Sequence, residues 1–338
     1  MKEKKQFLSR DTSICLRGVL ACMVLLCHIS AKVGIFGNSI AATLFSAFGY
    51  MGVSAFFFLS GYGIYEQFKE RPEYVNAFPR RRILPFYCLC VFCIAVYTLR
   101  DLIFYKAFSV KTFFLSFAIG GTVVDKGWYL QVQLLLYILF YLSFRFIKKG
   151  QVLLLSGATC AFCVICAVIG LDSTWYETVV CFVLGMVVSM HKEKVVKILD
   201  DGIKGWLILA ACGGLFVLTM YFGNASVLPF AARIIVKMLS AAFFACSIVI
   251  FVTKVRINNP VLRFLGVISL EIYVTQGLFL KMFKDTAHIG NDWLYALTVL
   301  AVTIAFSFAV HPVFKWINSI GRRERKPAVK GEENEHKN

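Results

Sequence analysis

The feature that most constrains this chain is a succession of apolar runs, most of them long enough to cross a lipid bilayer. A membrane-spanning helix needs about 20 mainly apolar residues, and in lipid the backbone polar groups must be satisfied within a helix or a closed barrel. Runs of this length indicate helices, so the predicted fold class is an all-α polytopic membrane protein. Ten spans are predicted, at residues 14–33, 44–65, 83–105, 128–147, 152–171, 176–191, 206–222, 228–252, 262–282 and 294–317.

Composition agrees with a single membrane bundle. Of the 338 residues, 59% are hydrophobic and only 16% are charged, so a soluble domain of this size could not cover its apolar surface. The chain shows no internal repeat and no linker rich in Gly, Ser or Pro that would divide it into halves. The stretch 107–122 is apolar but short, and we expect it to be interfacial or re-entrant rather than a span.

Basic residues set the expected orientation of the bundle. The formal net charge is +17, and the Lys and Arg residues lie mainly between the apolar runs. This pattern follows the positive-inside rule and favours contact with anionic membrane lipids over nucleic acid. The distribution of loop cations predicts that both termini are cytoplasmic. Residues 1–320 would then form the membrane domain, and the charged stretch 321–338 is expected to be a disordered cytoplasmic tail.

The twelve cysteines do not indicate a metal site. All of them fall inside apolar runs, and the closely spaced Cys160, Cys163 and Cys166 have no fourth ligand or charged neighbour. Small buried helix residues are the simpler interpretation, so no metal is predicted. The N-terminal run is interpreted as a retained first span, because it is long, contains Arg17 and lacks a small-residue cleavage motif.

The first span carries two ionisable side chains on one face. Arg17 and His28 are 11 residues apart, which on an α-helix is about 20° from a whole number of turns and about 16 Å along the axis. Ionisable residues are costly inside a membrane and indicate a functional site by default. With the N-terminus inside, Arg17 would lie near the inner surface and His28 near the outer one.

The other polar residues of the spans fall into two layers. The inner layer adds Ser60 and the triplet Arg80, Arg81 and Arg82, which suits a phosphate-bearing ligand because guanidinium groups bind phosphate bidentately. In the outer layer, a neutral imidazole could take a proton from an incoming hydroxyl group. The candidates for an acceptor site are Trp128, Gln133, Tyr137, Arg233, Glu271 and Gln276, of which Tyr137 and Glu271 lie between the layers.

Each candidate also has a purely structural explanation. The three arginines could be a membrane anchor, and Arg17 could extend to the inner surface. Gln133 or Gln276 alone could join neighbouring helices, and Glu271 could pair with Arg233. The histidine of the first span could simply be hydrogen-bonded to a carbonyl group. The other histidines lie at span ends, in an outer loop or in the tail and are treated as ordinary; they are His191, His288, His311 and His336.

Five short motifs occur in a fixed order over residues 17–276. They are Arg17-Gly18 with His28; Phe56-Phe57-Phe58-Leu59-Ser60-Gly61-Tyr62; Arg82-Ile83-Leu84-Pro85-Phe86-Tyr87; Trp128-Tyr129-Leu130 with Gln133 and Tyr137; and Ser269-Leu270-Glu271-Ile272-Tyr273-Val274-Thr275-Gln276. Together these motifs resemble the acyltransferase-3 family of integral membrane O-acyltransferases. The chain departs from the family pattern in three places, where a second arginine, a glutamate and a late histidine are replaced by Pro79, Gln133 and Gln276.

The resemblance implies a divergent membrane O-acyltransferase with His28 as general base. It implies an acyl-CoA donor, expected to be acetyl-CoA, which enters from the cytoplasm as a substrate, with no permanently bound cofactor. The acceptor would be a hydroxyl of a sugar, a cell-surface polysaccharide or a lipid-linked glycan, and the location a bacterial cytoplasmic membrane. The expected donor-binding residues are Arg17, Ser60, Arg80, Arg81 and Arg82.

Two other functions stay open at this point. An exporter of a polysaccharide or a lipid-linked sugar also uses buried His, Glu and Arg residues, although this chain lacks inverted repeats and paired broken spans. A sensing or scaffold module without catalysis is compatible with the glutamines at Gln133 and Gln276. The sequence indicates neither the oligomeric state nor the identity of the acceptor.

Overall fold

The computed structural model describes residues 7–34, 37, 39–118, 121–224, 228–255 and 257–321. These residues form helices joined by loops, with no β-strand among them. Within these ranges nine helices are long and apolar enough to span a membrane, or ten if the bent pair α12–α13 counts as one span. The predicted all-α polytopic fold is thereby confirmed, whereas the predicted tail lies outside the described residues apart from Gly321.

The helices are α1 (Arg10–Ser30), α2 (Ile40–Glu70), α3 (Tyr74–Phe78), α4 (Leu84–Arg100), α5 (Val110–Leu115), α6 (Trp128–Phe146), α7 (Gln151–Val168), α8 (Val180–Met190), α9 (Lys192–Asp200), α10 (Gly202–Asn224), α11 (Phe230–Lys254), α12 (Pro260–Val267), α13 (Ser269–Asp285) and α14 (Asp292–Ser319), with π-helical η1 (Pro79–Ile83) and η2 (Asp101–Tyr105) and the 3₁₀ turn η3 (Ser173–Trp175).

Two predicted spans differ in detail from the structure. The span predicted at 83–105 belongs to a continuous helix, Tyr74–Tyr105, in which the chain passes Pro79 and Pro85 by way of the π-helical turn η1. The span predicted at 262–282 bends by 70° between α12 and α13. In the stretch 107–122 the described residues hold only the short helix α5, in agreement with the prediction that it is not a span.

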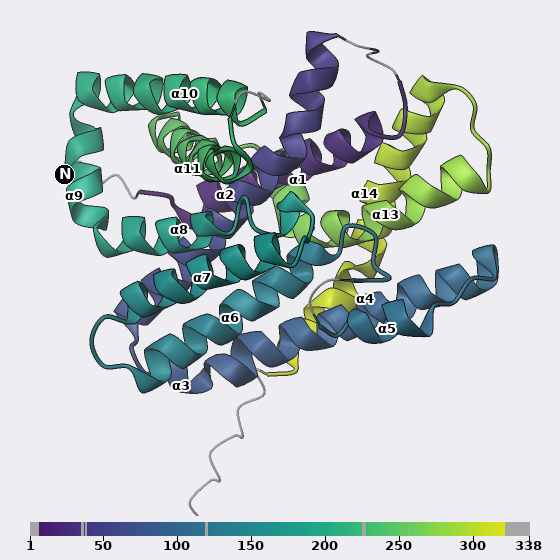
Figure 1. Cartoon of the computed structure of the whole chain (residues 1–338), viewed down its shortest axis with the longest axis horizontal. Helices are drawn as coiled ribbons and strands as arrows, with labels where there is room; N and C mark the ends of the chain where they lie inside the picture. Colours follow the sequence, from purple (N-terminus) through teal and green to yellow (C-terminus); the bar gives the residue numbers. More distant parts are fainter. Residues whose placement is uncertain are drawn as a thin grey trace, which may run out of the picture.

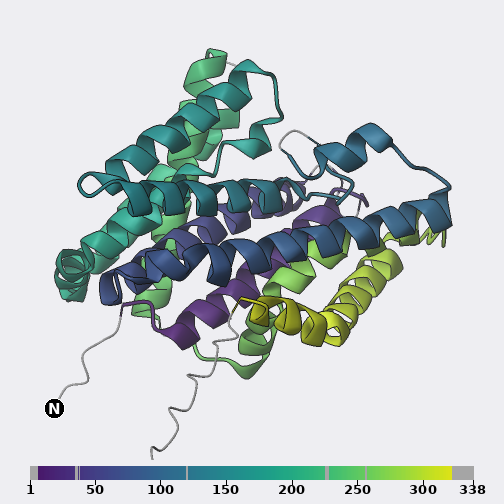
Figure 2. The same cartoon turned by 90° about the horizontal axis from the view of Figure 1, so that it is seen from below.

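The centre of the bundle is formed by α1, α2 and α8 (Figure 1). α2 packs along α8 and α1, and α1 packs in turn against α12 and α13. Figure 2 shows the long helix that contains α4 crossing one side of the bundle, between α6 and α14. At the periphery, α10 packs on α11 and exposes Ile203, Leu207 and Val217, as expected of a lipid-facing helix.

A close crossing of α2 and α8 holds the centre together. A Cβ atom added at Gly61 would lie 1.9 Å from the carbonyl oxygen of Phe182, and one added at Gly185 would lie 2.1 Å from that of Phe58. Small residues at such positions let two membrane helices pack backbone against backbone, which is a main source of helix association in lipid. Gly61 of the second sequence motif therefore has a structural role.

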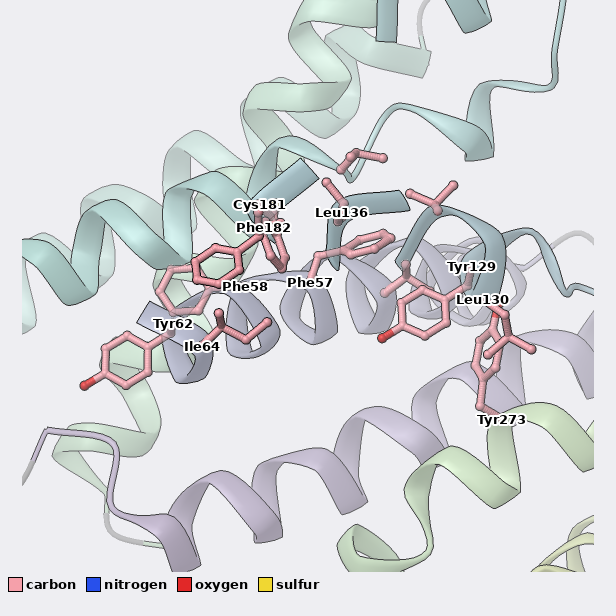
Figure 3. Close-up of a cluster of buried hydrophobic side chains, with 14 of the residues drawn as sticks. Phe57, Phe58, Tyr62, Ile64, Tyr129, Leu130, Leu136, Cys181, Phe182 and Tyr273 are labelled. Carbon is pink, nitrogen blue, oxygen red and sulfur yellow. The ribbon is translucent and has the colours of Figure 1, made fainter. Parts of the chain in front are cut away.

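Large buried side chains fill the space beside this crossing. Phe57, Phe58 and Phe182 are fully buried, and the Phe57 ring lies 5.0 Å from the ring of Tyr129 of α6. Figure 3 shows this cluster, with Tyr129 and Tyr273 next to one another at one end. The cluster thus connects α2 and α8 with α6 and α13, the two helices that carry most of the acceptor-site candidates.

A methyl group at Gly61 tests the α2–α8 crossing. We expect Gly61→Ala to destabilise the purified protein by about 1–3 kcal/mol, because the Cβ atom would overlap a backbone oxygen that cannot rotate away. The measurement is thermal unfolding in detergent. Gly63→Ala is the matched control, since a Cβ atom there meets nothing within 4 Å; equal melting temperatures for the two variants would contradict the prediction.

Candidate functional site

The candidate site is organised along one face of α1. Ser9 caps the helix by accepting a hydrogen bond from the backbone N–H of Thr12 at 3.2 Å, and apolar residues continue the helix to Ser30. The two ends of the face meet different helices. Arg17 lies near α6 and η1, whereas His28 interacts with a residue of α13. We call these two places the arginine centre, around Arg17 and Arg82, and the histidine centre, around His28 and Gln276.

The arginine centre joins two cations from distant parts of the chain. The guanidinium groups of Arg17 and Arg82 are close enough to repel each other, and Tyr129 and Tyr137 of α6 lie close to Arg17. Arg17 Nε donates a hydrogen bond to the carbonyl oxygen of Ser13 at 3.4 Å. Two half-buried cations close to each other suit an anionic ligand, because its charge would offset their repulsion.

Neutral side chains orient Arg82. Its Nε donates to the hydroxyl oxygen of Tyr74 at 2.8 Å, and its Nη2 donates to Oε1 of Gln67 at 3.2 Å. Arg80 and Arg81 precede it in the π-helical turn η1 and are exposed, whereas Arg82 is half-buried. Arg82 is thus the half-buried member of the triplet, and it lies near the arginine of α1.

A cavity of about 560 Å³ adjoins the arginine centre. Two of its lining residues, Gln67 of α2 and Tyr74 of α3, also bind Arg82, so the cavity lies next to the arginine centre. Its remaining lining carries both signs of charge. These residues are Glu70, Arg71, Glu73, Ala77 and Arg81.

The histidine centre contains polar atoms that lack a partner. The side chains of His28 and Gln276 are close enough to interact, yet neither His28 Nδ1 nor Gln276 Oε1 has a hydrogen bond of good geometry within the described part of the chain. Gln276 Nε2 donates to the carbonyl oxygen of Tyr273 at 2.9 Å, which fixes the amide. Lys126, just before α6, brings a positive charge close to the imidazole. A hydroxyl group has one hydrogen to donate, so an incoming hydroxyl would satisfy one of these two atoms, and donation to the imidazole nitrogen is the arrangement that a general base needs.

Two tyrosine rings lie between the centres. The rings of Tyr129 and Tyr273 are 5.0 Å apart, and both side chains are almost fully buried (Figure 3). The hydroxyl of Tyr129 donates to Oε1 of Gln133 at 3.5 Å, while Nε2 of Gln133 is buried without a partner among the described residues. Gln133 is therefore associated with the tyrosine pair, one turn along α6 from Tyr129.

The other predicted residues lie at the edge of these centres or away from them. Trp128 begins α6 and packs against Trp175, with ring centroids 6.5 Å apart, and Ser60 is half-buried on α2. Tyr137 packs against two phenylalanine rings beside the arginine centre. Arg233 is half-buried on α11, a helix that packs mainly against α10 and α2.

Glu271 pairs with a histidine that sequence reasoning treated as ordinary. His311 Nδ1 of α14 lies 2.6 Å from Oε1 of Glu271, whose side chain is only 5% exposed. The alternative pairing of Glu271 with Arg233 is therefore wrong. The two partners are 40 residues apart, so no local pattern predicts their contact.

Arg100 of α4 is a further buried cation that sequence reasoning missed. Its side chain is 4% exposed and pairs with Asp101 and Asp125. The signal was present, because Arg100 lies inside a predicted span, and the rule that singled out Arg17 applies to it equally.

Comparison with known proteins gives one family match. The acyltransferase-3 family model, described as an acyltransferase domain, matches residues 13–311. This range begins in α1, ends at His311 in α14 and includes every candidate residue of both centres. No curated protein and no solved structure matches the chain.

Removing one partner tests the Glu271–His311 pair. We expect His311→Ala to destabilise the protein by up to about 3 kcal/mol, because it leaves a buried carboxyl group without its partner. Thermal unfolding in detergent measures the effect, and the double variant Glu271→Gln/His311→Ala should lose less than the sum of the single changes. Lys204→Ala is the control, since its ion pair with Asp201 is exposed and should matter little. Additive losses would rule out the coupling.

Proposed function

The chain belongs to the acyltransferase-3 family, and on that premise we propose that it transfers an acyl group, expected to be acetyl, from cytoplasmic acyl-CoA to a hydroxyl of a sugar or glycan. The family and the membrane-spanning helices support a multi-pass membrane acyltransferase. We further propose His28 as the general base, a bacterial cell membrane as the location and both termini in the cytoplasm.

One observation carries the proposal: a single face of α1 connects a cationic centre with an imidazole. Arg17 and His28 are separated by about 16 Å along the helix, and each meets a different neighbouring helix. A transferase that takes its donor from one side of a membrane needs an anchor for the donor's charged end and a base at the reacting end. The two centres supply these two functions at the two ends of one rigid helix.

The arginine centre would bind the phosphate groups of coenzyme A. Guanidinium groups bind phosphate through paired hydrogen bonds, and the hydrogen bonds described for Arg17 and Arg82 go to neutral groups. The adjoining cavity of about 560 Å³ offers room for the polar part of the donor. From here the pantetheine arm would extend along α1 toward the histidine centre.

At the histidine centre, His28 would take the proton of the acceptor hydroxyl while that oxygen attacks the thioester carbonyl carbon. The new C–O bond gives a tetrahedral intermediate, whose collapse breaks the C–S bond. The imidazolium then returns the proton to the departing thiolate, so that His28 is regenerated. Gln276 would hold the imidazole in place, because its own amide is fixed by Tyr273.

The acceptor would enter at the end of α1 opposite the donor. With the predicted orientation, His28, Lys126 and the start of α6 lie toward the outside, where cell-surface polysaccharides and lipid-linked glycans are found. Purified membranes incubated with radiolabelled acetyl-CoA test this. Label that moves to a glycan supports the transferase, whereas glycan that crosses the membrane unlabelled would support an exporter instead.

Replacing His28 tests its role as base. We expect His28→Ala to lower the rate of acyl transfer about 10²–10⁴-fold, the usual contribution of a positioned general base, with folded protein recovered at wild-type levels. His191→Ala is the control, because that imidazole is exposed and its described hydrogen bond goes to a backbone carbonyl oxygen, that of Val187. Full activity of His28→Ala would show that the proposed mechanism is wrong.

The half-buried position of Arg82 within the arginine triplet gives a second test. We expect Arg82→Ala to raise the KM for acyl-CoA about 10- to 100-fold, the range for a lost charged hydrogen bond, and to leave the KM for the acceptor unchanged. The measurement is steady-state kinetics with each substrate varied in turn. Arg145→Ala, an exposed arginine at the end of α6, is the control. An unchanged donor KM would remove Arg82 from the donor site.

A further inference from the structure

Arg100, the last residue of α4, makes several charged and polar contacts. Its Nε and Nη2 donate to Asp101 Oδ1 at 2.9 and 2.8 Å, and its Nη1 donates to Asp125 Oδ2 at 2.6 Å. The guanidinium group also lies 4.6 Å from the centre of the Tyr97 ring. A cation buried at this depth in a membrane helix needs partners, and here two carboxylates supply them.

The contacts of Arg100 connect three parts of the chain that are distant in sequence. Nη1 also donates to the carbonyl oxygen of Gly277 in α13, at 3.5 Å, so it bridges α13 to Asp125 in the loop before α6. A Cβ atom at Gly277 would lie 2.6 Å from both the Cβ atom of Asp125 and the hydroxyl of Tyr97. The loop 123–127 therefore packs in direct contact with the backbone of α13 at Gly277.

Two tyrosines strengthen the same junction. Tyr97 donates from its hydroxyl to the carbonyl oxygen of Val274 at 2.8 Å, and Tyr273 donates to the carbonyl oxygen of Lys126 at 2.9 Å. All of these contacts fall on residues 273–277 of α13. Gln276, which interacts with His28, lies inside this short stretch, and Lys126 is the loop residue whose charge is close to the imidazole.

We propose that Arg100 is a positioning residue for acyl transfer. Its contacts with Asp125 and Gly277, which we call the clamp, hold the loop 123–127 against α13 and thereby keep Gln276 and Lys126 in place beside His28. The inference rests on the proposed function, because it assumes that His28 is the base. It assigns Arg100 no contact with substrate. The guanidinium group acts through Asp125 and the Gly277 carbonyl, and lysine cannot replace it fully because an ammonium group lacks the fixed fork of donors.

Kinetics of clamp variants test the proposal. We expect Arg100→Gln and Asp125→Asn each to lower kcat per folded molecule at least about tenfold while the donor KM stays within about twofold, since only the histidine centre is disturbed. Arg100→Lys should recover part of kcat. The double variant Arg100→Gln/Asp125→Asn should be no slower than Arg100→Gln, because both changes break one interaction.

The control is Glu177→Gln, which breaks another buried ion pair, the one with Lys237 at 3.0 Å. This variant should lose stability but keep kcat per folded molecule. If Glu177→Gln lowers kcat as much as Arg100→Gln, or if Arg100→Gln keeps the wild-type kcat, the positioning role is wrong. Should Arg100→Gln fail to fold, Asp125→Asn and Gly277→Ala carry the same test, since each disturbs the junction from another side.

Hydrogen–deuterium exchange separates a failure of the clamp from a failure of the proposed function. In Asp125→Asn and Arg100→Gln we expect faster exchange in peptides that cover 123–127 and 273–277, and unchanged exchange in α8 and α11. Exchange like that of the wild type would overturn the clamp whatever the activity. If exchange rises as expected but the wild-type protein transfers no acyl group, the clamp stands as a structural feature and the proposed function, with the positioning role built on it, falls.

Discussion

The close approach of α1 to α12 is the constraint on which both polar centres depend. A Cβ atom at Gly18 would lie 2.3 Å from the carbonyl oxygen of Leu262, and one at Gly266 would lie 1.8 Å from that of Ile14. Backbone contact of this kind fixes the rotation of α1 about its own axis. The face that carries Arg17 and His28 thereby lies to one side of the α12 contact, where it meets the arginine of η1 and the glutamine of α13.

Buried charges in this bundle are held in two different ways. Arg100 is surrounded by two carboxylates and a carbonyl oxygen, which compensate its charge and make it part of the framework. Arg17 and Arg82 instead bond to a carbonyl, a phenol and an amide, all neutral. Two cations held by neutral groups suit an anionic ligand. The partners, rather than the residue type or its depth in the membrane, thus distinguish a structural arginine from one suited to bind substrate.

Most of the fold could be predicted from the sequence, because the length of an apolar run reports directly on membrane thickness. The bend at Ile268 and the continuation of the third span back to Tyr74 could not, since both depend on how neighbouring helices support the backbone. The family resemblance was confirmed by the match over residues 13–311. The roles given to individual residues, and the orientation of the bundle, stay predictions.

The sequence by itself determined the set of spans and which residues share a face of one helix, because helical periodicity is local: Arg17 and His28 align whatever surrounds them. Only the tertiary structure decided what those faces meet. It paired Glu271 with His311, buried Arg82 more deeply than Arg80 and Arg81, and brought Arg100 to the stretch of α13 beside Gln276. Such contacts join residues tens to hundreds of positions apart, and they depend on where glycines allow helices to touch and how each helix is rotated as a result.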